Sequence, residues 1–145
     1  MMDKSGQCLC GAVKFTLRGV KPRFWACHCK MCQRWAGSAL MTVVVQPDAI
    51  EFEGLENVAT YQSSDWAERG WCRNCGSNIW YRMTGPGPHQ GRRHISVGLL
   101  DDPDGLTLGT EIFIDEKSSA FAYAGDTKKL TGAEVIAQFA PKDEE

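Results

Sequence analysis

The sequence has 145 residues, 43% of them hydrophobic, and its formal net charge is −2 at pH 7. This size suits one folded domain over residues 1–145, with its core at about residues 5–125. No run of about 18 apolar residues occurs, which argues against a membrane-spanning helix. The slight negative charge gives no support for nucleic-acid binding. The first residues lack the apolar segment of a secretory signal, so we expect a cytoplasmic protein.

Most of the chain has the pattern of β-strands. Val13, Phe15 and Leu17 alternate with polar residues, which is typical of a half-buried strand. Turn signals rich in Pro, Gly and Asp at 46–48, 84–88 and 101–105 separate the later strands. Those strands are predicted, in chain order, at 40–45, 50–52, 59–61, 78–83, 94–100 and 111–114.

One helix is predicted near the end of the chain. Thr131 and Glu134 can form a capping box, and Val135, Ile136 and Phe139 follow on one helical face. A short helical turn after residue 32 is left open, and the charged tail at 142–145 is expected to fray. The sequence therefore predicts a mainly β domain with one short C-terminal helix.

The seven cysteines fall into three clusters and none stands alone. In a reducing cytoplasm, clustered cysteines bind metal more often than they form disulfides. The alternative, buried cysteines with an occasional disulfide, would scatter them along the chain. The clusters are Cys8 with Cys10; Cys27, Cys29 and Cys32; and Cys72 with Cys75.

The count of seven divides naturally into four and three. Zinc prefers four tetrahedral ligands, and a structural site fills all four with protein groups, whereas a catalytic site keeps one position open. The two isolated pairs would form the closed site and the triple cluster the open one. In the reverse division, one pair joins two sulfurs of the triple cluster. The second site would then have to combine the last sulfur of that cluster with the other pair.

Four motifs resemble the glutathione-dependent formaldehyde-activating enzyme family, whose domain also occurs in centromere protein V. They are GQCLCG at 6–11, CHCKMCQR at 27–34 with Gly37 and Ser38, GWCRNCGS at 70–77, and VGLLDDP at 97–103. The resemblance covers most of the chain and implies a zinc-stabilised β-tent of antiparallel sheets. It implies two zinc ions per chain. The structural ion would lie on Cys8, Cys10, Cys72 and Cys75, and the catalytic ion on Cys27, Cys29 and Cys32.

The resemblance also implies a reaction and shows two departures. The reaction joins formaldehyde and glutathione into S-hydroxymethylglutathione, or cleaves that adduct, and so makes or breaks a carbon–sulfur bond. Family members often have His before the strand at 112–114 and Trp near position 121. This chain has Glu111 and Phe121 there, and if those positions touch substrate its specificity differs.

The residues around the triple cluster allow several roles. A thiol entering the open position would be held as thiolate. Lys30 and Arg34 could bind carboxylates of an anionic thiol such as glutathione, or could be solvated surface residues. His28 could shuttle a proton, but strand alternation between Cys27 and Cys29 favours packing behind the metal.

Three classes of function follow. The first is a zinc-dependent carbon–sulfur lyase acting on a thiol adduct, the second a non-catalytic carrier of glutathione, and the third a zinc-stabilised interaction module. The leftover three-cysteine cluster argues against the third class, because a structural module normally closes both sites. The expected partner is a small thiol rather than nucleic acid or membrane.

Overall fold

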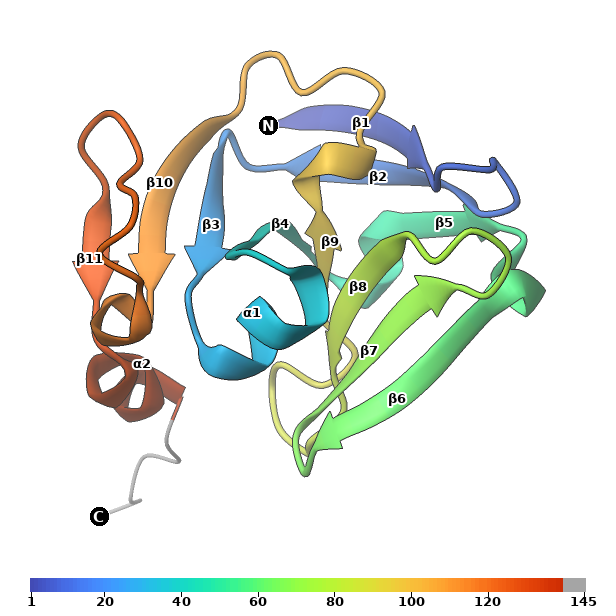
Figure 1. Ribbon diagram of the computed structural model, residues 1–145. Helices are drawn as coiled ribbons and strands as arrows, with labels where there is room; N and C mark the ends of the chain where they lie inside the picture. Colours follow the sequence, from blue (N-terminus) through green and yellow to red (C-terminus); the bar gives the residue numbers. More distant parts are fainter. Residues whose placement is uncertain (140–145) are drawn as a thin grey trace. The chain divides into compact units, whose positions relative to one another are not determined.

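The computed structural model describes residues 1–139, and β-strands are its main regular structure (Figure 1). The tail at 142–145 lies outside the described residues. The chain divides into two compact units. The first comprises residues 1–24 and 42–107, and the second comprises residues 25–41 and the described residues from 108 on.

The first unit contains an antiparallel three-stranded sheet. Its order is β1 (Met2–Gln7), β2 (Lys14–Val20) and β5 (Ile50–Glu53). Strand β1 is polar, and pairing with β2 rather than apolar alternation makes it a strand. Gly6 also bridges to Leu100, where a Cβ would lie 2.4 Å from the Leu99 oxygen, so this approach requires glycine. The chain entering the first cysteine pair is thereby fixed.

A second antiparallel sheet of the first unit pairs Thr42–Val45, the part of β4 (Leu40–Val45) that lies in this unit, with four further strands. In order across the sheet these are β9 (Arg93–Ser96), β8 (Asn78–Met83), β7 (Ala67–Cys72) and β6 (Val58–Ser64). Figure 1 shows β6, β7 and β8 (green) side by side. Short 3-10 helices η1 (Pro47–Ala49), η2 (Leu55–Asn57) and η3 (Val97–Leu99) join strands of this unit.

Both sheets of the first unit contribute to its hydrophobic core. Phe15 and Leu17 come from the three-stranded sheet, and Ile79, Trp80 and Ile95 come from the five strands. The rings of Phe52 and Trp80 lie 5.2 Å apart between centroids. Cys8 and Cys72 belong to the same core, so one cysteine of each isolated pair is anchored in packed surroundings.

The second unit carries the triple cluster. Strand β10 (Thr107–Ile112) lies between β3 (Arg23–Cys27) and β11 (Lys128–Leu130), and β10 and β11 are parallel. Helix α1 (Lys30–Ala36) follows β3, and the 3-10 helix η4 (Ile114–Glu116) follows β10. Helix α2 (Gly132–Phe139) ends the described chain.

The helix and strand predictions are largely confirmed, with corrections. The amides of Thr131 and Glu134 bond to each other's side chains, which confirms the capping box. Val135 is buried, but Ile136 is 64% exposed, so the predicted apolar face was too wide. The open question after Cys32 is answered by α1, which begins before that residue.

Three predicted strands had wrong bounds. The strand expected at 59–61 runs from Val58 to Ser64. The strand expected at 94–100 ends at Ser96 and continues as η3. The strand expected at 111–114 runs from Thr107 to Ile112, because Phe113 takes a left-handed backbone conformation with φ 53°. Strands β1, β3, β7 and β11 were not predicted. Within residues 1–139, neither helix has the length and apolar character needed to cross a bilayer.

Candidate metal centres

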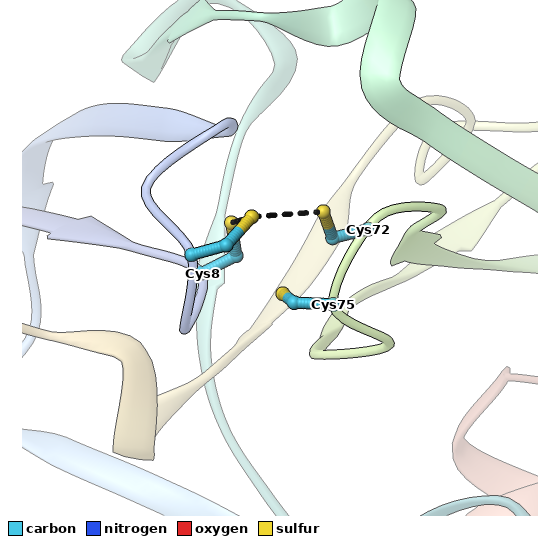
Figure 2. A group of neighbouring side chains, drawn as sticks. Cys8, Cys72 and Cys75 are labelled. Carbon is cyan, nitrogen blue, oxygen red and sulfur yellow. Dashed lines mark hydrogen bonds between the residues drawn. The ribbon is translucent and has the colours of Figure 1, made fainter.

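Four sulfurs from two distant segments of the first unit meet in one place. Cys8 and Cys10 follow β1, whereas Cys72 ends β7 and Cys75 lies in the turn to β8. Their Sγ atoms all lie within 4.8 Å of one another. The Sγ atom of Cys10 is 3.7 Å from that of Cys8 and 3.8 Å from that of Cys72. Figure 2 shows Cys8 facing Cys72 and Cys75 across a common space. This four-cysteine group could hold a metal ion.

Backbone hydrogen bonds hold the two turns that carry these sulfurs. In each turn a glycine amide donates to the carbonyl of the first cysteine, Gly11 to Cys8 at 3.1 Å and Gly76 to Cys72 at 2.8 Å. Both glycines have φ near +80°, the region that glycine adopts without steric cost. The amide that follows Cys8 donates to Ser77 Oγ at 2.9 Å, which joins the two turns.

The thiols of this group differ in how readily they ionise. Burial raises the pKa of the Cys72 thiol to about 11. The hydrogen bond with Ser77 lowers the pKa of Cys75 to about 5. A thiolate is therefore favoured at one position and opposed at another, and a divalent cation would stabilise the thiolate at both.

The three-cysteine group lies in the second unit, where β3 passes into α1. Cys27 ends β3, Cys29 is the N-cap of α1 and Cys32 lies in its first turn. Their Sγ atoms also lie within 4.8 Å of one another, and no fourth His, Cys, Asp or Glu of residues 1–139 joins them. The neighbouring sulfurs of Cys29 and Cys32 raise the pKa of Cys27. No disulfide joins any of the seven cysteines.

The cap geometry explains why this short segment is ordered. The Cys32 amide donates to Cys29 Sγ at 3.4 Å, so the cysteine sulfur takes the place of the usual N-cap oxygen. At the other end, Gly37 has φ 79° and its amide donates to Gln33 O at 2.8 Å. Helix α1 is thus closed at both ends and fixes Cys29 relative to Cys32.

His28, which stands between Cys27 and Cys29 in the sequence, is buried and bonded to Glu111. Its exposed fraction is 1%, that of Glu111 is 2%, and His28 Nε2 lies 2.8 Å from Glu111 Oε1. Thr127 Oγ1 donates to Glu111 Oε2 at 2.5 Å, and Lys129 Nζ lies 3.8 Å from the same oxygen. Burial opposes ionisation of Glu111, but the bonds from Thr127 and His28 outweigh it and lower its pKa.

This pairing determines which nitrogen of His28 carries a proton. An ionised carboxylate only accepts hydrogen bonds, so His28 Nε2 must donate. In the neutral imidazole, Nδ1 is then the acceptor. The His28 ring also lies 5.9 Å from each of the rings of Phe121 and Tyr123. The sequence favoured packing for His28, and its burial agrees, but no sequence pattern indicated its carboxylate partner.

A cavity of about 330 Å³ lies in the second unit beside the same segment. His28 and Gln33 line it, as do the turn at 37–39 and the loop residues Ser118 and Phe121. Gln33 Nε2 donates to the carbonyls of His28 and Glu116, at 2.5 and 3.0 Å, which connects α1 to the chain after η4. The volume is at the lower end of the range for small-molecule sites.

The two residues predicted to bind the carboxylates of a ligand lie outside this cavity. Lys30 and Arg34 are exposed on α1 and do not line it. Their contact with ligand carboxylates stays a prediction. Gln33 and Ser118 were not predicted; Gln33 could have been noticed because it follows a candidate ligand, but nothing near Ser118 pointed to the cavity.

Comparison with known proteins identifies the family of this chain. A family model described as "Glutathione-dependent formaldehyde-activating enzyme" matches residues 3–116. The chain belongs to this family. The resemblance inferred from the four motifs is thereby confirmed.

A protein of similar sequence supports the assignment to the glutathione-dependent formaldehyde-activating family. A Schizosaccharomyces pombe protein, named as an uncharacterized lyase, is 31% identical over 139 residues. The match covers 94% of this chain and 96% of the yeast protein. Family and relative together support a glutathione-related function of the lyase type.

A solved structure supports the fold. The crystal structure of a Rhodobacter sphaeroides protein matches with a TM-score of 0.55 at 22% identity. The match covers 67% of this chain and 87% of the other. At that identity the likeness concerns the mainly β fold alone.

Proposed function

We propose that the protein is a zinc-dependent carbon–sulfur lyase that acts on an adduct of a small thiol, with glutathione the leading candidate, and a carbonyl compound such as formaldehyde. The observation that carries the proposal is the three-cysteine group, which no fourth His, Cys, Asp or Glu of the described residues joins. A closed structural site would have four. The family membership supports the same reaction class.

Two sulfur–sulfur separations of the four-cysteine group have the length expected around zinc. A tetrahedron with Zn–S bonds of about 2.3 Å has sulfur–sulfur edges of about 3.8 Å. The measured separations of 3.7 and 3.8 Å in the four-cysteine group match that edge. We assign Cys8, Cys10, Cys72 and Cys75 to a structural ion, and Cys27, Cys29 and Cys32 to the second ion.

The proposed reaction adds a thiol to a carbonyl carbon, or reverses that addition. A carbon–sulfur bond forms, the carbonyl π bond breaks, and the proton of the thiol ends on the new hydroxyl oxygen. When bound, zinc would supply a position that takes the thiol as its thiolate. The rest falls to the protein: exposed Lys30 and Arg34 attract the carboxylates. The carbonyl compound is held in the cavity lined by His28 and Gln33, the sequence neighbours of the three cysteines.

The metal content is the first test. We expect two zinc ions per chain in protein purified without oxygen, measured by elemental analysis against protein concentration. One ion per chain in fully reduced, zinc-supplemented protein would contradict the two-site assignment. Partial filling in aerobic preparations would not, because exposed thiolates oxidise readily.

Direct binding of the thiol is the second test. In cobalt-substituted protein, glutathione should intensify the thiolate-to-cobalt absorption, because a fourth sulfur joins the three of the cluster. Its affinity should rise with pH up to the thiol pKa of about 8.5, since the thiolate binds and the proton is released. Its affinity should fall as salt screens Lys30 and Arg34.

S-methylglutathione is the matched control for that experiment, because it keeps the carboxylates but lacks an ionisable thiol. If S-methylglutathione competes for the protein as well as glutathione does, binding through sulfur is contradicted. Turnover with and without zinc then separates the lyase from a thiol carrier, which shares the binding step alone.

A further inference from the structure

We propose that the cavity beside the three-cysteine group holds an uncharged, mainly apolar substituent on the carbonyl carbon, so that the preferred carbonyl compound is an aldehyde larger than formaldehyde. The inference rests on the proposed function and specifies its substrate class. It follows from the size, the charge and the polarity of the walls of the cavity.

The cavity is too large for formaldehyde alone. One water takes about 30 Å³ of liquid volume, so 330 Å³ is roughly ten times that share. Formaldehyde has only two heavy atoms and would leave most of the space unfilled. An alkyl chain of several carbons or an aromatic ring would fill it.

The walls disfavour a charged group. No Lys, Arg, Asp or Glu is among the residues that line the cavity, and its one ionisable member, His28, is bonded to the Glu111 carboxylate. Lys117 is nearby, but its ammonium donates to the carbonyls of Ser118, at 2.6 Å, and Phe121. That ammonium also lies 4.7 Å from the centroid of the Phe121 ring. A carboxylate in the cavity would therefore lie near a buried negative charge and would compete with two carbonyls for Lys117. We place the carboxylates of the thiol at Lys30 and Arg34 instead.

Most polar groups on the walls already have partners within the protein. Both amide hydrogens of Gln33 are used by backbone carbonyls, and Ser38 Oγ donates to Ala39 O at 3.0 Å. Ser118 Oγ accepts a hydrogen bond from the Ala120 amide at 3.0 Å. The ring of Phe121, 41% exposed, provides the largest apolar wall. An apolar substituent would cover it.

The test compares aldehydes on the zinc-loaded protein. Exchange between free glutathione and its adduct is followed by NMR at equilibrium for formaldehyde, propanal and benzaldehyde, each against its uncatalysed rate. We expect an acceleration about 10-fold or more greater for propanal or benzaldehyde than for formaldehyde, since added methylenes in a fitting cavity discriminate by this amount.

Two variants test whether the cavity causes the preference. Ser38→Phe, at an exposed position of the wall, should fill the space and lower the acceleration of the larger aldehydes by a greater factor than that of formaldehyde. Phe121→Ala should weaken the preference by removing the apolar wall. Ile136→Ala, on the exposed side of α2, is the control. It should change neither the acceleration of the larger aldehydes nor that of formaldehyde.

A binding measurement tests, without turnover, whether the cavity accepts an apolar group. Calorimetric affinity should rise from S-methylglutathione to S-propylglutathione by about 15-fold, at roughly fourfold per methylene, and Ser38→Phe should flatten that rise. Faster exchange of formaldehyde than of the larger aldehydes, with no rise across the thioethers, would overturn the inference and leave the lyase proposal standing. No acceleration of any adduct, with the thioether rise intact, would overturn the lyase proposal and leave the apolar cavity.

Discussion

Replacing Cys72 by serine is expected to abolish folding. Cys72 is fully buried in the core of the first unit and is one of four sulfurs assigned to the structural ion. Structural zinc contributes an apparent binding free energy of about 10–16 kcal/mol in zinc-finger peptides. A whole domain has a stability of only about 5–15 kcal/mol. Loss of the ion should therefore remove the cooperative thermal transition, as measured by circular dichroism and calorimetry.

Two comparisons separate the metal from simple loss of packing. Cys75→Ser, at a partly buried sulfur, should unfold the chain as well, and a strong chelator should do the same to the unmodified protein. Cys29→Ser makes the same chemical change in the three-cysteine group. Because serine is a better N-cap than cysteine, α1 should persist, and the variant should fold with one zinc and without thiol binding. A folded Cys72→Ser variant beside an unfolded Cys29→Ser variant would reverse the assignment.

Removing the carboxylate of Glu111 is expected to lower the free energy of unfolding by about 3 kcal/mol or more. A buried donor left without its acceptor costs about 1–3 kcal/mol, and two such donors together cost about 3 kcal/mol or more. In Glu111→Ala, both His28 Nε2 and the Thr127 hydroxyl lose their acceptor. Urea denaturation of the zinc-loaded protein measures the change.

Glu111→Gln is the matched control, because it keeps the shape and one acceptor oxygen but loses the charge. It should cost roughly 1 kcal/mol, as for the loss of one buried hydrogen bond. The charge also predicts a pH dependence. Because the folded pKa of Glu111 is lowered, its contribution is complete above the ordinary value of 4.5 and is lost as the pH falls through the lower folded pKa. Equal stability of the unmodified protein and Glu111→Ala at neutral pH would show that the pair is not stabilising.

The sequence predicted the cysteine groups well because ligand chemistry restricts them so strongly. Tetrahedral coordination requires four donors in a small volume, so the spacing of Cys72 and Cys75 and the total count were informative. The grouping found in the structure is the one favoured from that count. Strands with strong apolar character, such as β4 and β8, were also predicted with their observed bounds.

Features set by distant partners were not predicted. Strand β1 has a polar sequence and exists because it pairs with β2. The bond between His28 and Glu111 joins residues 83 positions apart, and neither local sequence indicates the other. The end of β10 depends on the left-handed conformation of Phe113, an unusual state for a bulky side chain.

The distance along the chain within the four-cysteine group sets an order of events during translation. Cys72 is 62 positions after Cys10, so at about 5–20 residues per second it is made roughly 3–12 s later. During that interval the nascent chain exposes two thiols whose coordinating partners do not yet exist. The amino-terminal turn can complete the proposed zinc site only after Cys75 has emerged, and until then a reducing environment must keep Cys8 and Cys10 from oxidation.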